Sequence, residues 1–302
     1  MRLFVLYGKL FYMKHPDEQY KNLIRFILDN GEKVTTPQKI DALTCFGTTP
    51  PLVYDLSNGT PIITERQLGI KGAIGEMCAF INGEQDFSVM KEKYAVPGPF
   101  WDPWISDAKC EHAGAKKGCL GDGSYGPAFA AFPDNQGGSF DQFKNAIEML
   151  SDEKLRNRRT IYITSWIPFM NGYGGRQKSV ITPCHGNLHF RVINGHLDLI
   201  SDHRAADVLL GFPNDIISYC AVLKMMESVT GLKARRLIFH LRDAHIYENQ
   251  LEEAKEILSR ESRTFPELKI INPKKDIKEY RAVDFELVDY NPHPKMIIPA
   301  AV

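Results

Sequence analysis

A cysteine followed by a histidine, with an arginine twenty residues further on, is the part of this sequence best suited to chemistry. Cys184 stands between Pro183 and His185, and Arg204 follows later in the chain. A cysteine acts as a nucleophile in its thiolate form, so it needs a cation or hydrogen-bond donors nearby to lower its pKa. Arg204 could supply that charge if the intervening chain folded back on itself.

The segment between Cys184 and Arg204 predicts such a reversal. Residues 187–194 and 196–202 each alternate partly between apolar and polar side chains, and Asn194-Gly195 is typical of a tight hairpin turn. A hairpin here would return Arg204 to the neighbourhood of Cys184. From these residues alone, Cys184 could also be a buried packing residue, as many single cysteines are.

Several motifs resemble the thymidylate synthase family in their order and spacing. They are Pro183-Cys184-His185, Arg204-Ala205-Ala206-Asp207, residues 211–219 (GFPNDIISY), residues 243–247 (DAHIY), Glu76, Trp101, Trp104, Tyr125-Gly126, Arg158-Arg159 and Asn291-Pro292-His293-Pro294. The resemblance implies an α+β fold with a mixed β-sheet covered by helices. It also implies one catalytic domain over residues 1–302, with a loop insertion at about 105–120, and a homodimer formed through the sheet.

The resemblance assigns roles to individual residues. The catalytic candidates it implies are Cys184, Glu76, Asp215 and Arg204. The nucleotide-binding candidates are Arg158, Arg159, Arg204, Asp207, Asp215, His245, Tyr247 and His185. Those for the co-substrate 5,10-methylenetetrahydrofolate are Trp101, Trp104, Asp207, Gly211 and Val302. In the family the arginine pair reaches into the neighbouring subunit, so the resemblance implies two shared active sites.

Most of these candidates also have an ordinary structural interpretation. Glu76 falls near an apolar helical stripe, where a carboxyl is costly without a partner or a purpose, but it could be an exposed helix glutamate. Trp101 and Trp104 could form a wall for a pteridine ring or could be core residues. The pair Arg158-Arg159 suits a phosphate clamp, and it could equally be an exposed basic turn.

Asp215 is the departure from the family pattern with the largest consequence. Where thymidylate synthases proper have Asn, Asp resembles the cytidylate and deoxycytidylate hydroxymethylases of the same family. A carboxylate accepts a hydrogen bond from the cytosine N4 amino group but repels the O4 of uracil, to which an amide can donate. Asp215 could instead cap a helix that begins at Ile216, because Asp is a favoured N-cap residue; the two roles can coexist.

The phosphate-binding residues also differ from the family pattern. Residues 35–47 correspond to a loop that carries an arginine in the family, and Lys39 is the nearest cation here. Lys39 offers a point charge in place of a planar fork, and it could be an ordinary solvated residue. Ala205 stands where thymidylate synthases have a phosphate-binding serine. Its smaller side chain slightly favours CMP over dCMP, because it could admit a ribose 2'-hydroxyl.

The predicted reaction transfers a one-carbon unit from 5,10-methylenetetrahydrofolate to C5 of CMP or dCMP. The product is 5-hydroxymethylcytidylate, formed through an adduct between Cys184 and C6 of the base. Two alternatives stay open. The first is C5 methylation of dUMP or dCMP with dihydrofolate as by-product, and the second is an inactive homologue that binds nucleotide or RNA.

Composition fits a globular enzyme whose partner is a small nucleotide, with no need for nucleic acid or a membrane. The 302 residues are 43% hydrophobic, and 37 Lys and Arg balance 37 Asp and Glu. No apolar run is long enough to cross a membrane, and residues 1–13 do not resemble a signal peptide. Six scattered cysteines fit a reducing compartment, so a cytoplasmic location is expected. Cys110, His112 and Cys119 supply too few ligands for a zinc site, so no metal is expected.

Periodicity predicts the elements that would position these residues. Apolar residues at helical spacing predict helices, and β-branched runs that end in polar groups predict strands. The predicted helices cover residues 17–30, 216–230 and 248–260, a strand end followed by a helix covers 62–80, and strands cover parts of 155–166 and 236–247.

Overall fold

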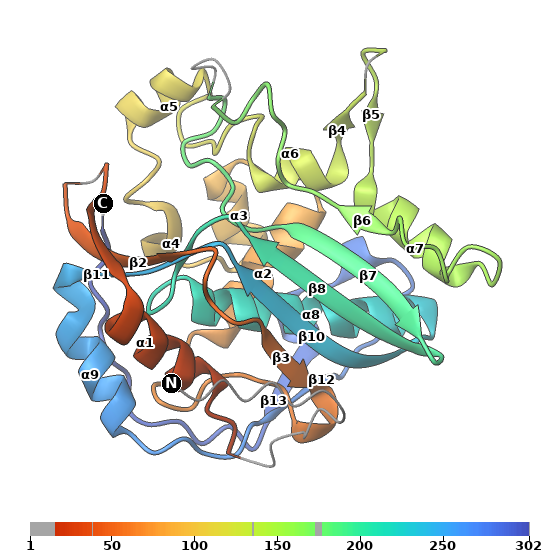
Figure 1. Ribbon diagram of the computed structural model, residues 1–302. Helices are drawn as coiled ribbons and strands as arrows, with labels where there is room; N and C mark the ends of the chain where they lie inside the picture. Colours follow the sequence, from red (N-terminus) through yellow and green to blue (C-terminus); the bar gives the residue numbers. More distant parts are fainter. Residues whose placement is uncertain (1–15, 38, 135, 173–176, 302) are drawn as a thin grey trace.

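A mixed β-sheet with helices packed on one face forms the centre of the computed structural model (Figure 1), which describes residues 16–37, 39–134, 136–172 and 177–301. The strand order is β3-β10-β8-β7-β6, and β10 runs parallel to β8 while the other pairs are antiparallel. The strands are β3 (Leu52–Asp55), β6 (Tyr162–Ile163), β7 (Asn187–Ile193), β8 (His196–His203) and β10 (Lys233–Leu241). The predicted α+β class with a mixed sheet is confirmed.

A second sheet continues from the ends of two central strands. Its order is β1-β2-β11-β9, and it consists of β1 (Glu32–Thr35), β2 (Asp41–Phe46), β9 (Ala206–Asp207) and β11 (Asp243–Tyr247). The prediction of one strand over residues 236–247 is therefore wrong. The chain leaves the central sheet at Arg242, whose backbone N–H donates to the carbonyl of His203 across 2.9 Å, and enters the second sheet at Asp243.

The predicted hairpin is confirmed as β7 and β8. The two strands pair in antiparallel register from Asn187 opposite Asp202 to Ile193 opposite His196. Asn194 and Gly195 form the turn with φ values of 52° and 78°. Two successive positive φ angles match the twist of the flanking strands, which is why an Asn-Gly pair suits this connection.

The long helix α8 (Phe212–Thr230) packs on the inner face of the central sheet. It begins earlier than predicted, because Pro213 lies in the first turn, where its fixed φ favours helix initiation and its missing N–H costs nothing. Gly231 ends the helix with a φ of 73°. Asp215 is therefore inside the first turn, and Gly211 occupies the N-cap position. The interpretation of Asp215 as the N-cap is wrong.

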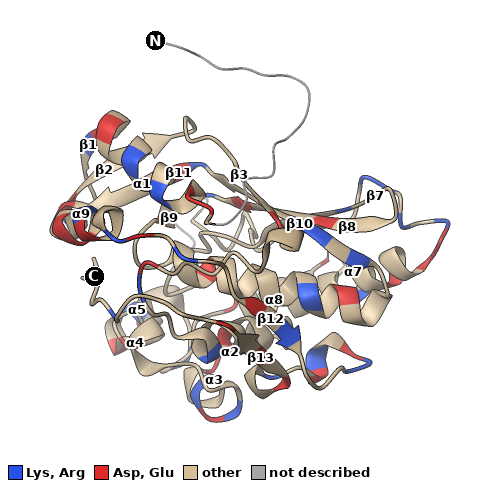
Figure 2. Ribbon diagram, turned by 90° about the horizontal axis from the view of Figure 1, so that it is seen from below, with Lys and Arg blue, Asp and Glu red and all other residues tan. Residues whose placement is uncertain are grey.

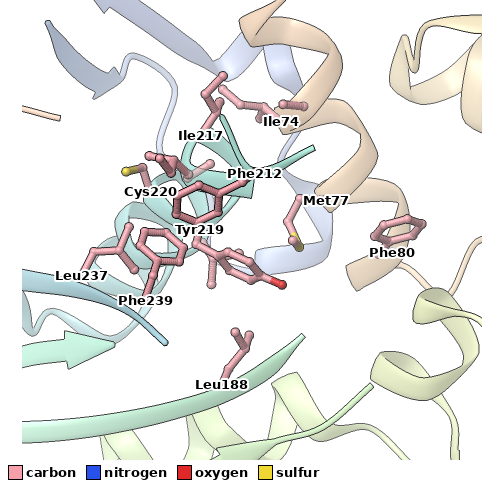
Figure 3. Packing of buried hydrophobic residues seen from close by; sticks show 14 of the residues in the cluster. Ile74, Met77, Phe80, Leu188, Phe212, Ile217, Tyr219, Cys220, Leu237 and Phe239 are labelled. Atoms are coloured by element: carbon pink, nitrogen blue, oxygen red, sulfur yellow. The ribbon is translucent and has the colours of Figure 1, made fainter. Parts of the chain in front are cut away.

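The core lies between α8, the sheet and α2 (Ile70–Ile81). Figure 3 shows Phe212 and Tyr219 of α8 close to Phe239 of β10, and Phe212 and Phe239 stack edge to face at 5.1 Å. On the other side of α8, Met77 of α2 belongs to the same buried cluster. The predicted helix near residue 70 is confirmed, whereas the strand end predicted at 62 is wrong, since those residues form a buried irregular segment.

Shorter elements complete the fold and carry the loops around the central sheet. The helix predicted over 17–30 is confirmed as α1 (Gln19–Asn30), and the helix predicted over 248–260 is confirmed as η3 (Glu248–Gln250) followed by α9 (Leu251–Ser259). The insertion predicted at 105–120 contains α5 (Asp107–Ala113), so it is not only a loop. The remaining helices are α1 (Gln19–Asn30), α3 (Phe87–Tyr94), α4 (Gly98–Trp101), α5 (Asp107–Ala113), α6 (Tyr125–Ala130), α7 (Gln142–Ser151), α9 (Leu251–Ser259) and the short turns η1 (Leu56–Asn58), η3 (Glu248–Gln250), η4 (Ile277–Glu279) and η5 (Ala282–Asp284). The remaining strands pair as β4 (Phe132–Pro133) with β5 (Ser139–Phe140) and β12 (Glu267–Ile270) with β13 (Phe285–Val288).

The central sheet has a buried face and a half-exposed face. Figure 2 shows α8 and α2 below the strands, on the side where the side chains of β7, β8 and β10 are buried. The opposite face carries the half-exposed side chains of His189, Ile200 and Ile238. Among the helices that the structure describes, none is long and apolar enough to cross a membrane.

Candidate active site

Cys184 and Arg204 lie side by side, as the hairpin prediction required. The distance from Arg204 Nη2 to Cys184 Sγ is 3.4 Å, and the Arg204 backbone N–H donates to the Cys184 carbonyl across 2.7 Å. The guanidinium also donates to the carbonyls of Pro183 and Thr182 at 3.2 and 3.3 Å. Its central carbon lies 5.6 Å from the ring centre of Trp166. These contacts fix the cation beside the sulfur, and the predicted proximity is confirmed.

The local environment determines the charge state of the Cys184 thiol. Burial raises the pKa of the Cys184 thiol, the Arg204 guanidinium lowers it in part, and the carboxyls of Asp215 and Asp243 raise it further. The backbone N–H of Cys184 donates to Tyr125 Oη across 2.8 Å, which fixes the loop that carries the sulfur. The resting thiol is therefore protonated, and Arg204 is the group that stabilises its thiolate.

Asp215 lies between the imidazoles of His185 and His203. The distance from Oδ1 to His185 Nε2 is 3.4 Å, and the distance from Oδ2 to His203 Nδ1 is 3.5 Å. The other ring nitrogen of His185 makes a short hydrogen bond with Tyr219 Oη. Burial raises the pKa of Asp215 well above its usual range, and the nearby carboxyls of Glu76 and Asp207 raise it further. A carboxyl in this position favours its protonated form.

The two histidines of this cluster are neutral. Burial lowers the pKa of His185 to about 3, and burial together with His185 lowers the pKa of His203 well below its usual range. The ring of His185 also stacks on Tyr125, with 4.5 Å between the ring centres and 25° between the planes. Neutral imidazoles have one donor and one acceptor nitrogen each, so they can orient a carboxyl without pairing with its charge.

Glu76 projects from α2 with its carboxyl held by Trp101. The indole N–H donates to Oε1 across 2.6 Å. Burial raises the pKa of Glu76 to about 7, while the Trp101 hydrogen bond lowers it. A carboxyl that titrates near neutrality is suited to moving a proton in either direction. Trp101 itself is buried, with 7% of its surface exposed.

A family model described as thymidylate synthase matches residues 18–302. The chain belongs to the thymidylate synthase family. The family reaction transfers a one-carbon unit from methylenetetrahydrofolate to a nucleotide, and the arrangement of Cys184, Arg204 and Glu76 fits a transferase of this kind.

The family-predicted residues on the second sheet lie beside the same site. Asp207 accepts backbone hydrogen bonds from Leu209 and Leu210 at 3.1 and 2.9 Å, and its Oδ2 accepts from Gln250 Nε2 at 3.0 Å. Gln250 also donates to the Pro299 carbonyl at 2.9 Å, so it joins Asp207 to the C-terminal segment. Burial raises the pKa of Asp207. Gly211 follows at the N-cap of α8.

His245 and Tyr247 lie on β11, next to Asp207 on β9. The register places His245 opposite Asp207, and the His245 and Tyr247 rings meet edge to face at 5.0 Å. Burial, together with the nearby Asp207 and Cys184, raises the pKa of Tyr247 to about 12. The Tyr247 hydroxyl is therefore a neutral donor and acceptor close to the nucleophile.

Other predicted residues do not join this cluster. Arg158 and Arg159 are exposed near β6, and their guanidinium groups make no hydrogen bond or ion pair with any residue that the structure describes. Lys39 is exposed as well. Trp104 is half-buried and carries the Lys109 ammonium 4.4 Å above its ring centre.

Two further predictions concern the C-terminal residue and metal binding. Val302 lies outside the residues that the structure describes, as do residues 1–13. Within the described ranges, no group of three or more His, Cys, Asp or Glu side chains could hold a metal ion.

Three residues that build the site were given no role from the sequence. Tyr125 supports the Cys184 loop, Gln250 holds Asp207, and His203 faces Asp215. Tyr125 was noted as part of a family motif, whereas Gln250 and His203 were not noted, and of these two His203 had a usable signal. It immediately precedes Arg204, and it continues the inward alternation of Leu197, Leu199 and Ser201 along β8.

Proposed function

We propose that this member of the family is a cytidylate 5-hydroxymethyltransferase. It transfers a one-carbon unit from 5,10-methylenetetrahydrofolate to C5 of CMP or dCMP and gives 5-hydroxymethylcytidylate. The observation that carries the proposal is the buried carboxyl of Asp215, which lies between two neutral imidazoles and close enough to Cys184 to raise the thiol's pKa.

The carboxyl of Asp215 suits cytosine better than uracil. Cytosine presents an amino donor at N4 and an acceptor at N3, whereas uracil presents an acceptor at O4 and a donor at N3. A protonated carboxyl offers one acceptor oxygen and one hydroxyl donor, which matches the cytosine edge. Burial favours this protonated form at Asp215. Facing uracil in the same orientation, this carboxyl would set its acceptor oxygen against O4 and its hydroxyl against the N3–H.

Each catalytic side chain has a step that its surroundings support. Cys184 adds as thiolate to C6 of the base, with Arg204 stabilising the negative sulfur before attack. The addition makes C5 nucleophilic, so C5 can form a bond to the one-carbon unit that 5,10-methylenetetrahydrofolate supplies when bound. Glu76 exchanges protons on the N4 and N3 side of the ring. After C5 loses its proton, the bond between the one-carbon unit and tetrahydrofolate breaks and leaves an exocyclic methylene on C5. Water adds to that carbon, and release of Cys184 restores the aromatic base.

The residues proposed to bind the folate have room for hydrogen bonds to it. Asp207 accepts three hydrogen bonds from the protein, and a carboxylate has about four acceptor positions. One position therefore remains for an N–H donor of the pteridine. The half-buried ring of Trp104 could form an apolar wall, with Gly211 leaving space at the start of α8. Trp101 and Val302 complete the set carried over from the family pattern.

We also propose a homodimer through the half-exposed face of the central sheet. That face carries apolar side chains such as Ile200 and Ile238, which a partner sheet could cover. Arg158 and Arg159 are exposed and unpaired with described side chains, as expected if they bind the phosphate in the partner's site. His245 and Tyr247 would hold the sugar, and His185 would support the base from below.

The decisive experiment incubates the enzyme with 5,10-methylenetetrahydrofolate and CMP, dCMP, UMP or dUMP in parallel. Nucleotide mass and dihydrofolate absorbance are followed together. A cytosine nucleotide that gains a hydroxymethyl group without dihydrofolate formation supports the proposal and identifies the sugar. A methyl gain with dihydrofolate formation contradicts it and indicates a synthase-type reaction. Nucleotide binding without turnover would instead favour an inactive binding homologue.

A further inference from the structure

His203 is a buried residue that has no role in the proposed reaction steps. Its ring is fully buried at the end of β8. Its Nε2 lies 3.1 Å from Ser201 Oγ, whereas its Nδ1 makes no hydrogen bond with any described residue. The Asp215 carboxyl faces Nδ1, with 3.5 Å between Nδ1 and Oδ2. An unpaired polar atom in a protein interior costs free energy, so it calls for a functional explanation.

The neighbours of His203 are compatible with a ring proton on Nδ1. A serine hydroxyl can donate or accept, so Ser201 can donate to Nε2 and leave the ring proton on Nδ1. Tyr219 also bonds to Ser201, and each hydroxyl has one proton, so Tyr219 then donates to Ser201 and accepts from His185 Nδ1–H. In this arrangement Asp215 Oδ2 faces the N–H group of His203, and Oδ1 faces the unprotonated Nε2 of His185. The gap of 3.5 Å at His203 is slightly long for a hydrogen bond, and such contacts often tighten when substrate binds.

No other described group is placed to orient the Asp215 carboxyl from the protein side. Glu76 on α2 and Asp207 on β9 act on it only as negative charges. Tyr219 lies one turn further along α8 and bonds to His185. Within the described ranges, no Lys or Arg forms an ion pair with Asp215. The two imidazoles therefore carry the orientation.

We propose that His203 is a positioning residue that donates from Nδ1 to Asp215 Oδ2 and thereby sets the preference for cytosine over uracil. The inference rests on the proposed function, in which Asp215 reads the base. When Oδ2 is held as an acceptor, the carboxyl proton resides on Oδ1. Asp215 then presents one acceptor and one donor in a fixed order, as the N4 and N3 atoms of cytosine require.

Two substitutions separate this role from simple packing. In His203→Asn the amide nitrogen can occupy the position of Nδ1 and still donate to Asp215. In His203→Gln the longer side chain places its amide near the position of Nε2, so it keeps Ser201 as partner and loses the donor to Asp215. Both variants remove the ring and its packing against Phe212 and Phe239, so they are matched in that respect.

The readout is kcat/KM for CMP relative to UMP, measured from pH 5 to 9 for the wild type and both variants. We expect His203→Gln to lose about tenfold or more of the cytosine preference, in line with a hydrogen bond to an ionisable group, and to shift the pH profile. His203→Asn should retain most of the preference. Equal losses in the two variants, or an unchanged preference in His203→Gln, would overturn the proposal.

A tautomer measurement distinguishes a failure of this inference from a failure of the proposed function. Nitrogen-15 NMR of histidine-labelled protein with bound CMP reports which ring nitrogen carries the proton, and the His203 signal is assigned by its loss in His203→Asn. A proton on Nδ1 is expected. A proton on Nε2 alone would refute the positioning role whatever the substrate is. If Nδ1 is protonated but the wild type prefers UMP, the proposed function and the specificity role fail while the positioning contact stands.

Discussion

The indole N–H of Trp101 donates to the Glu76 carboxyl across 2.6 Å, which links the short helix α4 to the buried helix α2. The hydrogen bond opposes the effect of burial, and the pKa of Glu76 is about 7 as a result. Besides its proposed place in the folate site, Trp101 therefore adjusts the proton affinity of Glu76, the carboxyl proposed to exchange protons with the pyrimidine.

Trp101→Phe should slow turnover through Glu76. The substitution keeps an aromatic ring but removes the donor, so the pKa of Glu76 should rise above about 7. A smaller fraction of Glu76 is then ionised at pH 7, and the Glu76-dependent limb of the kcat profile should move to higher pH. We expect kcat at pH 7 to fall about fivefold, because loss of a hydrogen bond to a charged group is worth about one pKa unit and the ionised fraction of Glu76 falls accordingly. Trp104→Phe is the matched control and should leave the Glu76-dependent limb of the kcat profile at the same pH. If that limb also stays at the same pH in Trp101→Phe, the hydrogen bond does not act on Glu76.

Glu76 should also make stability depend on pH. Its folded-state pKa of about 7 lies above the ordinary value of 4.5, so the folded protein binds this proton more tightly than the unfolded chain does. The stabilisation is fully present below pH 4.5 and is lost as pH rises towards about 7. Glu76→Gln cannot ionise at this position, so its Tm should fall less than the Tm of the wild type as pH rises through this window. Parallel Tm profiles for the two proteins would contradict the buried, proton-binding state of Glu76.

Asp215→Asn should change which base is used. The amide replaces a hydroxyl donor with an NH₂ group that can donate to O4 of uracil, so kcat/KM for UMP or dUMP should rise relative to that for the cytosine nucleotides. A change of about tenfold or more in the ratio is expected, since each unpaired polar contact costs on the order of 1–3 kcal/mol. Asn214→Ala, one residue earlier in α8, serves as a control because its side chain donates to the Leu210 carbonyl. A ratio that stays constant in Asp215→Asn would remove Asp215 as the base-reading residue.

Sequence reasoning succeeded where the relevant contacts are local. The Asn194-Gly195 turn predicted the hairpin, and the hairpin placed Arg204 beside Cys184. Prediction from the sequence failed where contacts join distant segments. The break at Arg242 follows from pairing with His203 in another strand, and no local pattern marks it.

The start of α8 was also predicted wrongly, at Ile216 in place of Phe212, but for a different reason. Pro213 is a signal for the first turn of a helix and was available in the sequence. Asp215 is also a favoured N-cap residue, and this preference led to the wrong prediction of a helix start at Ile216. The cluster around Asp215 depends on His185, His203 and Tyr219, which lie on three different segments, so only the folded structure could bring them together.

Mixed dimers test whether the arginines act across subunits. Cys184→Ala should abolish turnover and leave nucleotide binding intact, because it removes only the nucleophile. Arg159→Ala should weaken nucleotide binding about tenfold or more, as expected for a charged hydrogen bond to phosphate. Arg159 is exposed and its guanidinium makes no hydrogen bond or ion pair with a described residue, so its loss should not affect folding.

If Arg159 serves the partner's site, a dimer of one Cys184→Ala chain and one Arg159→Ala chain has one site with both defects and one site with neither. At a nucleotide concentration well below the KM of Arg159→Ala, mixing and re-associating the two variants should then raise turnover above that of either variant alone. The same mixture should show no gain if Arg159 binds phosphate within its own chain, because every site would then carry one defect. Light scattering of each variant checks that both form dimers, and a monomeric wild type would rule out the shared site altogether.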